Sequence, residues 1–186
     1  MKKILPVIFI AAVLFACNSE EKKAETSTTD SKTETGKAPV ELINDSSFLA
    51  SSKATMTAFE NKDINGYTAN MADNIKFRWS NGDSLVGLQA VKDYWSGRFN
   101  NVIDTIRFSN HIFLPVMANV SPNGGTTPSG KWMLNWHMVN VKYKNGKTLN
   151  FWVHNAQHYN DAGKIDDYAQ YMDRHPVIEA TKDMAK

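Results

Sequence analysis

Cysteine is nearly absent from this chain of 186 residues, since Cys17 is its only one. A single cysteine excludes an internal disulfide and a zinc site built from several thiolates. The cohesion of a folded domain must therefore come from side-chain packing. Aromatic residues, at 11% of the chain, are the obvious supply.

Concentrated charge of one sign is also missing. The formal net charge is only +2, and no run of Lys and Arg is longer than a pair. Nucleic-acid binding depends on clustered positive charge, so the sequence gives it little electrostatic support. We expect no nucleic-acid partner.

No hydrophobic run is long enough to span a bilayer as a helix. The mainly apolar stretch 4–16 follows two lysines and ends in small residues at a cleavage point, which is typical of a secretory signal. Because Cys17 follows Leu14-Phe15-Ala16, residues 1–16 resemble a bacterial lipoprotein signal, whose cysteine is lipidated after cleavage. The alternative is an ordinary signal peptide with an incidental cysteine. The resemblance implies a membrane anchor at Cys17.

Residues 17–41 are expected to form the lipidated cysteine and a disordered tether. Glu, Lys, Thr, Ser and Asp dominate this stretch, and no large apolar residue precedes Val40. Such a segment cannot bury enough surface to offset its ordering entropy. Glu20-Glu21 resembles the acidic signal that takes some bacterial lipoproteins to the cell surface. We therefore expect a lipid-anchored protein of the bacterial cell envelope, at the outer membrane and exposed on its surface.

One folded domain is expected over residues 42–178, followed by a tail over 179–186. Apolar residues at helical spacing predict a helix that Ser46 or Ser47 caps and that runs to Phe59, a short one after Asp63, and a third from Gly87. Alternation predicts strands over 75–79, 103–117, 131–143, 148–159 and 164–172, with a brief one ending at residue 86. Three helices before a meandering sheet indicate an α+β fold with the helices on one sheet face.

Three short motifs carry a family likeness. They are Ala72-Asp73-Asn74-Ile75, Gly87-Leu88-Gln89-Ala90-Val91, and Gly163-Lys164-Ile165 leading to Tyr171-Met172-Asp173. In this order the chain resembles the nuclear transport factor 2-like (NTF2-like) superfamily, particularly its SnoaL-like branch. The likeness implies a cystatin-like α+β cone, with a curved mixed or antiparallel sheet wrapped around three N-terminal helices and a pocket at its wide end. The superfamily includes isomerases, dehydratases, hydrolases, cyclases and non-catalytic binders, so the fold alone does not determine function.

Counting register through the turns Asn145-Gly146 and 161–163 predicts which side chains face the pocket. The expected inner set is Lys76 and Arg78; Trp132, Leu134, Trp136, Met138 and Asn140; Val153, Asn155 and Gln157; and Tyr168, Gln170 and Met172. A bulge would shift any of these series by one residue. We expect ligand contacts from Arg78, Trp132, Trp136, Met138, Asn155, Gln157, Tyr168 and Met172. Their rings offer flat apolar contact and their amides orient a ligand, unless the rings simply fill the core.

Arg78 has two interpretations. On a pocket wall its guanidinium would select a ligand with a carboxylate or phosphate. On the surface its stem would lie along aromatic neighbours while its head pairs with Asp83.

Catalysis finds less support than binding. In the steroid-isomerase branch a carboxylate on the first strand abstracts the proton, and here the resemblance places Arg78 there and Asn155 at the companion acid. His137, His154 and His158 have no carboxylate at matching parity on their strands, so we expect neither a metal nor a cofactor. An inward His154 beside Asp166 or Asp167 would require a register shifted by one residue.

The expected function is therefore non-catalytic binding of a small, partly apolar ligand or a protein partner at the envelope. The alternative is a SnoaL-like hydrolase, cyclase or dehydratase that uses His154 or Asn155 with Asp167 or Tyr168. A homodimer through the outer sheet face is compatible with either function.

Overall fold

The computed structural model describes residues 37–121 and 127–184. The predicted signal 1–16, Cys17 and the tether up to residue 36 lie outside the described residues. The elements, in chain order, are β1 (Val40–Leu42), α1 (Ser46–Glu60), α2 (Ile64–Thr68), β2 (Met71–Trp79), β3 (Ser84–Val86), α3 (Leu88–Asn101), β4 (Ile103–Ala118), β5 (Gly130–Tyr143), β6 (Thr148–Tyr159), β7 (Ile165–Tyr171) and α4 (His175–Thr181). The predicted α+β class is confirmed. α4 runs across residue 178, the expected end of the domain.

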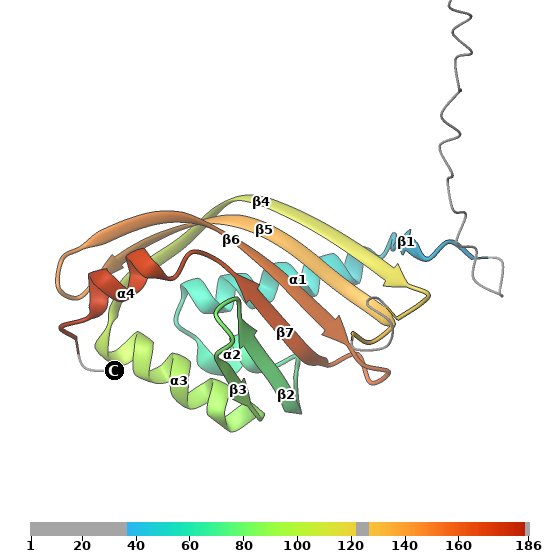
Figure 1. The fold of residues 1–186 in the computed structure, drawn as a ribbon, viewed down its shortest axis with the longest axis horizontal. Coiled ribbons are helices and arrows are strands. Elements are labelled where there is room, and N and C mark those ends of the chain that lie inside the picture. The colour runs from blue at the N-terminus through green and yellow to red at the C-terminus, as the bar shows by residue number, and fades with distance from the viewer. Residues whose placement is uncertain (1–36, 122–126, 185–186) are drawn as a thin grey trace, which may run out of the picture. The chain divides into compact units, whose positions relative to one another are not determined.

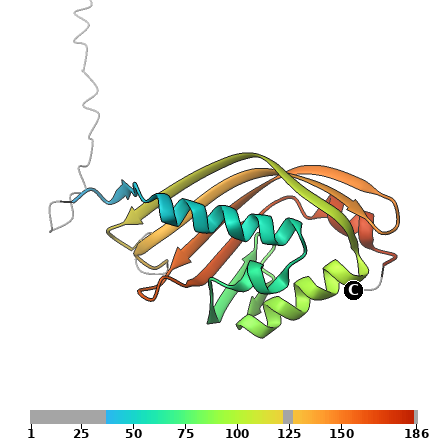
Figure 2. The same ribbon diagram turned by 180° about the vertical axis from the view of Figure 1, so that it is seen from behind.

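The strands form one seven-stranded sheet in the order β1-β4-β5-β6-β7-β2-β3. Its pairs are antiparallel except β2 with β7, which run parallel. The sheet is strongly curved and open, and α1, α2 and α3 lie on its concave side (Figures 1 and 2). α4 lies at the end of the sheet where β5 turns into β6 (Figure 1).

Capping fixes the first helices. The carboxylate of Asp45 accepts the backbone N–H groups of Ser47 at 2.9 Å and Phe48 at 3.2 Å. The N-cap of α1 is therefore Asp45, which lies just before the two serines expected to provide it. Asp63 caps α2 as predicted, accepting the N–H of Gly66 at 3.0 Å.

The third helix begins without a side-chain cap. Gly87 precedes it with φ of 90°, and its N–H donates to the carbonyl oxygen of Ile75 at 2.8 Å. That left-handed backbone is one that glycine adopts without strain. Val91, Trp95 and Phe99 then recur at a spacing of four residues and form the buried stripe of α3.

Aromatic packing joins the helices to the sheet. The Phe59 ring meets those of Tyr67, Trp95 and Phe99 edge-on, at centroid distances of 4.7, 4.7 and 4.9 Å. Phe77 has no exposed surface and stacks on Tyr168 at 4.4 Å. Such edge-on and stacked contacts add to the energy of area burial.

The inward face of β5 differs from the prediction by one residue. Asn135 pairs with Asn155 and His137 with Val153, and residues opposite each other in a ladder share a face. The expected inner residues Trp132, Leu134, Trp136, Met138 and Asn140 therefore lie on the outer face, and the inner ones are Met133, Asn135, His137, Val139, Val141 and Tyr143. The error arose at the turn between β5 and β6. Lys142 pairs with Thr148 there, so even-numbered residues of β5 lie opposite even-numbered residues of β6, whereas the prediction placed even-numbered residues of β5 on the same face as odd-numbered residues of β6.

β2 and β4 correct two further expectations. Phe77 pairs with inward Tyr168, so Lys76 and Arg78 point outward rather than into the pocket. In β4 the register shifts between Ser109 and Ile112, and Asn110 there has a φ of 54°. This bulge ends the even alternation that was predicted for 103–117.

Beyond the bulge, β4 contributes to a second, smaller cluster on the outer face. Val116 and Ala118 pack there with Trp132, which is 7% exposed. The Trp132 indole N–H donates to the carbonyl oxygen of Pro128 at 3.1 Å. This contact brings the residues just before β5 against the outer side of the sheet.

Replacing Phe77 tests the proposed junction between sheet and core. Phe77→Ala should lower the free energy of unfolding by about 3–5 kcal/mol, because it leaves a cavity beneath Tyr168. Val86→Ala is the control, because that side chain is 69% exposed, and a change within about 0.5 kcal/mol is expected. Urea denaturation measures both. Equal losses in the two variants would contradict this account of the core.

Candidate functional site

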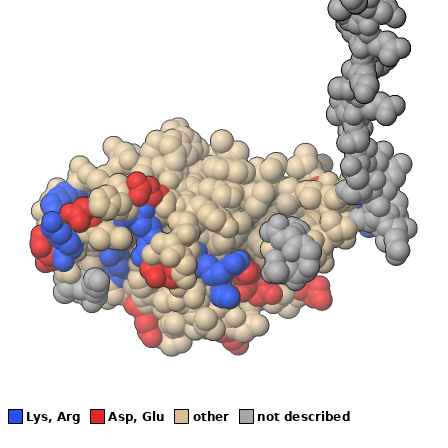
Figure 3. Space-filling view, in the orientation of Figure 1, with Lys and Arg blue, Asp and Glu red and all other residues tan. Residues whose placement is uncertain are grey.

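A cavity of about 660 Å³ lies between the concave sheet face and the helices. Its size is typical of small-molecule sites. The exposed members of its lining are Asp83, Asp93, Ile178 and Lys182. The cavity therefore opens between α3, the β2–β3 turn and α4. Charged side chains of both signs gather at the α4 end of the face shown in Figure 3.

Aromatic rings from both the helices and the sheet line the cavity. The rings that line it are Phe59, Tyr67, Trp79, Tyr94, Trp95, Phe108, Tyr143, Phe151 and Tyr168. Of the predicted contact residues, Asn155, Gln157, Tyr168 and Met172 line the cavity, whereas Arg78, Trp132, Trp136 and Met138 do not. The predicted aromatic character is present, but most of it comes from other residues.

Four buried polar side chains from β5 and β6 lie together in the deep part of the cavity. They are Asn135, His137, Asn155 and Gln157, and their exposed fractions are between 2% and 5%. The Asn155 amide donates to the Asn135 side-chain oxygen at 3.0 Å, and Nδ1 of His137 lies 3.2 Å from the same oxygen. Because that oxygen accepts, Nδ1 carries the hydrogen and Nε2 of the ring is left as an acceptor.

One atom of this group has no partner. Oδ1 of Asn155 is buried and forms no hydrogen bond within residues 37–121 and 127–184. A buried acceptor without a donor costs free energy, of the order of 1–3 kcal/mol. A bound molecule with an N–H or O–H group would remove this cost.

His137 is the imidazole of the cavity, although the sequence indicated an outward position for it. Burial, together with the neighbouring charge of His111, lowers its pKa to about 4. The ring is therefore neutral near pH 7. With so low a pKa it is a weak proton acceptor for general-base chemistry.

Tyr168 lies beside Gln157 and Tyr67 in the cavity lining. Burial raises the pKa of Tyr168 to about 12 and that of Tyr67 well above its ordinary value. Both phenols therefore stay protonated and act as donors or acceptors rather than as charges.

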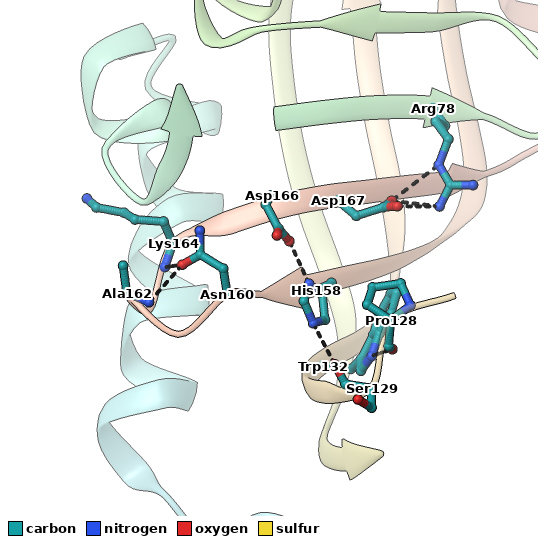
Figure 4. A network of polar contacts seen from close by, with 10 residues as sticks. All are labelled: Arg78, Pro128, Ser129, Trp132, His158, Asn160, Ala162, Lys164, Asp166 and Asp167. Atoms are coloured by element: carbon teal, nitrogen blue, oxygen red, sulfur yellow. Dashed lines mark hydrogen bonds and ion pairs between the residues drawn. The ribbon is translucent and has the colours of Figure 1, made fainter. Parts of the chain in front are cut away.

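Carboxylates do not accompany these groups in the part of the chain that the structure describes. Asp83 and Asp93 line the cavity only at its opening, where both are exposed. Asp167 lies on the outer sheet face and holds Arg78 through contacts of 2.6 and 2.8 Å (Figure 4). Arg78 is thus paired with Asp167 and not with Asp83, which was the partner in its surface interpretation. Asp83 pairs with Arg174 at 2.7 Å.

The candidate pair of His154 and Asp167 is not assembled. His154 lies on the outer face, stacked between Trp136 at 4.4 Å and Tyr171 at 5.5 Å. The strand register places Asp167 opposite His158 instead.

A histidine–aspartate contact does form, but outside the cavity. Nδ1 of His158 lies 2.6 Å from Asp166, and Nε2 lies 2.9 Å from the carbonyl oxygen of Ser129 (Figure 4). Gly130 permits this approach, because a Cβ atom there would come within 3.0 Å of Nε2. Both ring nitrogens are engaged, so this contact fastens residues 129–130 to the sheet.

Two further observations bear on the site. Across the described segments, no three His, Cys, Asp or Glu side chains come close enough to hold a metal ion. None of the helices in these segments combines the length and apolar character needed to cross a membrane.

Comparison with known proteins identifies the fold. Neither a family model nor a curated protein matches this sequence. An NTF2-like protein of unknown function from Burkholderia pseudomallei is 14% identical with a TM-score of 0.58, covering 73% of this chain and 97% of that chain. An LEH-like epoxide hydrolase from M. tuberculosis is 14% identical with a TM-score of 0.52, covering 73% and 96%. TerC, co-crystallised with polyporic acid, is 14% identical with a TM-score of 0.55, covering 74% and 99%. The predicted NTF2-like fold is confirmed.

The pKa of His137 predicts a pH dependence of stability. Its folded value of about 4 lies below the ordinary 6.5, so the unfolded chain takes up the proton first as pH falls. The free energy of unfolding should therefore drop by up to about 3 kcal/mol between pH 6.5 and pH 4. His137→Gln should flatten this part of the pH profile of stability. His175→Gln, at an exposed position, should leave the profile unchanged. Urea titrations at several pH values measure the slope, and an unchanged slope in His137→Gln would contradict the assignment.

Proposed function

We propose that this protein is a lipid-anchored envelope protein whose NTF2-like domain binds a small, partly apolar molecule without catalysis. The observation that carries the proposal is the unpartnered Oδ1 of buried Asn155 inside an aromatic cavity. Rings along the wall supply apolar contact, and the Asn155 oxygen and His137 Nε2 supply acceptors for a donor group on the ligand. TerC, which shares the fold, was co-crystallised with polyporic acid, and this supports small-molecule binding.

The distribution of acids and bases favours binding over turnover. The carboxylates of the lining lie at the opening of the cavity. The deep end holds amides and the His137 imidazole, which is a weak base. Proton abstraction from carbon needs a base whose pKa is near the working pH. The groups that line the cavity instead resemble a recognition site built from fixed hydrogen-bonding dipoles.

An enzyme of the SnoaL-like kind is the second candidate. It is favoured by His137, which lies in the cavity next to Asn135, with the protonated Tyr67 and Tyr168 also in the lining. In such a hydrolase, cyclase or dehydratase, His137 would take the place that the sequence suggested for His154. Turnover that His137→Gln abolishes, with ligand affinity retained, would favour this candidate over the first.

A homodimer through the outer sheet face remains part of the proposal. Ile112, Trp152 and Tyr171 are about half exposed on or beside that face, at 55%, 49% and 48%. Large apolar side chains left in solvent are a common mark of association.

Ligand binding can be tested at Asn155. Asn155→Leu removes the unpartnered acceptor and also the hydrogen bond to Asn135. These two effects oppose each other, so the free energy of unfolding should stay within about 1 kcal/mol of wild type while ligand affinity falls about tenfold. A thermal-shift screen of small molecules with an apolar body and a hydroxyl or amide donor supplies the ligands, and isothermal titration gives the affinities.

The matched control is Asn150→Leu on the exposed outer side of β6. It should change neither quantity. A screen in which no such molecule stabilises the wild type would overturn the proposed binding function.

The anchor is tested separately at Cys17, which lies outside the described residues. Cys17→Ser should move the protein from the membrane fraction to the soluble fraction of its host, whereas Ser19→Ala should leave it with the membranes. Fractionation with detergent-phase partitioning measures this. Membrane retention of Cys17→Ser would refute the lipoprotein assignment.

A further inference from the structure

Among the residues that the structure describes, Arg98 at the open end of the cavity has no counter-ion. It comes from the last turn of α3 and lines the cavity. Its Nε atom is buried and has no hydrogen-bond partner, and its guanidinium forms no ion pair within the described residues. A buried donor on a charged group is costly to leave unpaired.

The other cations at the opening are already paired. Arg174 contacts Asp83 at 2.7 Å and lies 4.9 Å from the centre of the Trp79 ring. Lys182 contacts Glu179 at 3.1 Å. Arg98 therefore differs from them in having a charge that no acidic side chain of the described segments neutralises.

The nearest acid on its own helix points elsewhere. Asp93 accepts a hydrogen bond from Gln89 at 2.8 Å. A separation of five residues also places it about 140° around the helix axis from Arg98. Asp93 thus remains a separate negative charge at the rim.

A second unpartnered donor lies one helical turn before Arg98. The indole nitrogen of Trp95 is buried without a hydrogen-bond partner among the residues described, and Trp95 also lines the cavity. Residues three apart share one face of a helix. α3 thus carries two unsatisfied N–H donors, one of them charged, on side chains that line the cavity.

The charge of Arg98 also acts on the cavity wall. Burial raises the pKa of Tyr143, and the positive charge of Arg98 opposes this rise. Tyr143 is 2% exposed and lines the same cavity. The guanidinium field therefore reaches buried groups, where it is screened less than at the surface.

We propose that the ligand of this cavity is an amphipathic carboxylic acid whose carboxylate is bound by Arg98 and the Trp95 indole. The inference rests on the proposed binding function and names its ligand class. A carboxylate has two acceptor oxygens and matches the planar guanidinium. A phosphate monoester, with two negative charges, would be repelled more strongly than a carboxylate by the unpaired charge of Asp93 at the rim. The apolar body then lies against the aromatic wall, toward Asn155.

Three probes with ten carbon atoms each separate these contributions: decanoate, decanol and decyl phosphate. Isothermal titration at pH 7.5 keeps the carboxylate ionised. Wild-type protein should bind decanoate about tenfold to a hundredfold more tightly than decanol. Decyl phosphate should bind more weakly than decanoate, and tighter binding of the phosphate would overturn the assignment to a carboxylate.

Arg98→Gln should remove the preference for decanoate and leave decanol affinity unchanged, so that decanol binding also reports an intact cavity. Trp95→Phe keeps a ring but loses the N–H group, and should weaken decanoate binding about threefold or more with little effect on decanol. Lys76→Gln is the control, since it removes one positive charge at an exposed position on the outer face. It should leave the preference as it is.

The possible outcomes distinguish failure of the carboxylate site from failure of the proposed binding function. If decanol and decanoate bind the wild type equally, or if Arg98→Gln keeps the preference, the carboxylate site is overturned and the binding function stands. If Lys76→Gln loses the preference as much as Arg98→Gln does, the attraction is general and the site is again overturned. If neither probe binds, the proposed function and this inference both fall.

Discussion

The pairing of Asn135 with Asn155 is the constraint on which the site depends. Side chains alternate strictly between the two faces of a strand, so one pair of opposite residues fixes the orientation of all the others in the ladder. With this pair inside, His137 and Gln157 follow into the cavity, and Trp132 and Trp136 go to the outer face. A shift by one residue would exchange an amide-lined chamber for an indole-lined one.

The resulting chamber is polarised along its length. Its deep end offers acceptors, from Asn155 and His137, while its open end offers donors, from Trp95 and Arg98. Aromatic rings also line the chamber. Unpaired polar groups at opposite ends of an apolar space define an orientation for whatever is bound, because only one direction satisfies both ends.

The element order and fold class could be predicted because periodicity and turn residues are local signals. The inward faces of β6 and β7 also followed from the sequence. The inward face of β5 did not follow from the sequence. The turn at Asn145 pairs even-numbered residues of β5 with even-numbered residues of β6, and only the backbone geometry of the loop determines this pairing. The bulge at Asn110 was equally hidden, since an asparagine is compatible with both a strand and a left-handed residue.

The functional residues were missed for related reasons. His137 was assigned to the wrong face together with the rest of β5. Arg98 sits on a helix at a position whose neighbours are Trp95 and Phe99, and the sequence contains no sign that its charge lacks a partner. The guanidinium role considered for Arg78 requires an inward side chain, and Arg78 instead meets Asp167 on the outer face. Pairing across strands is a tertiary property that composition and spacing do not encode.

The change of face at Asn110 has a mechanical consequence. Beyond Asn110, Val116 and Ala118 pack with Trp132 on the convex side of the sheet. At this end of β4 the convex face is therefore covered by packed side chains, and α1 packs against the concave face. Toward α4 the concave side is hollow. Closely packed layers yield little under load, whereas a hollow layer can deform. The strands are therefore packed on both faces at one end and border an open space at the other, next to the short C-terminal helix.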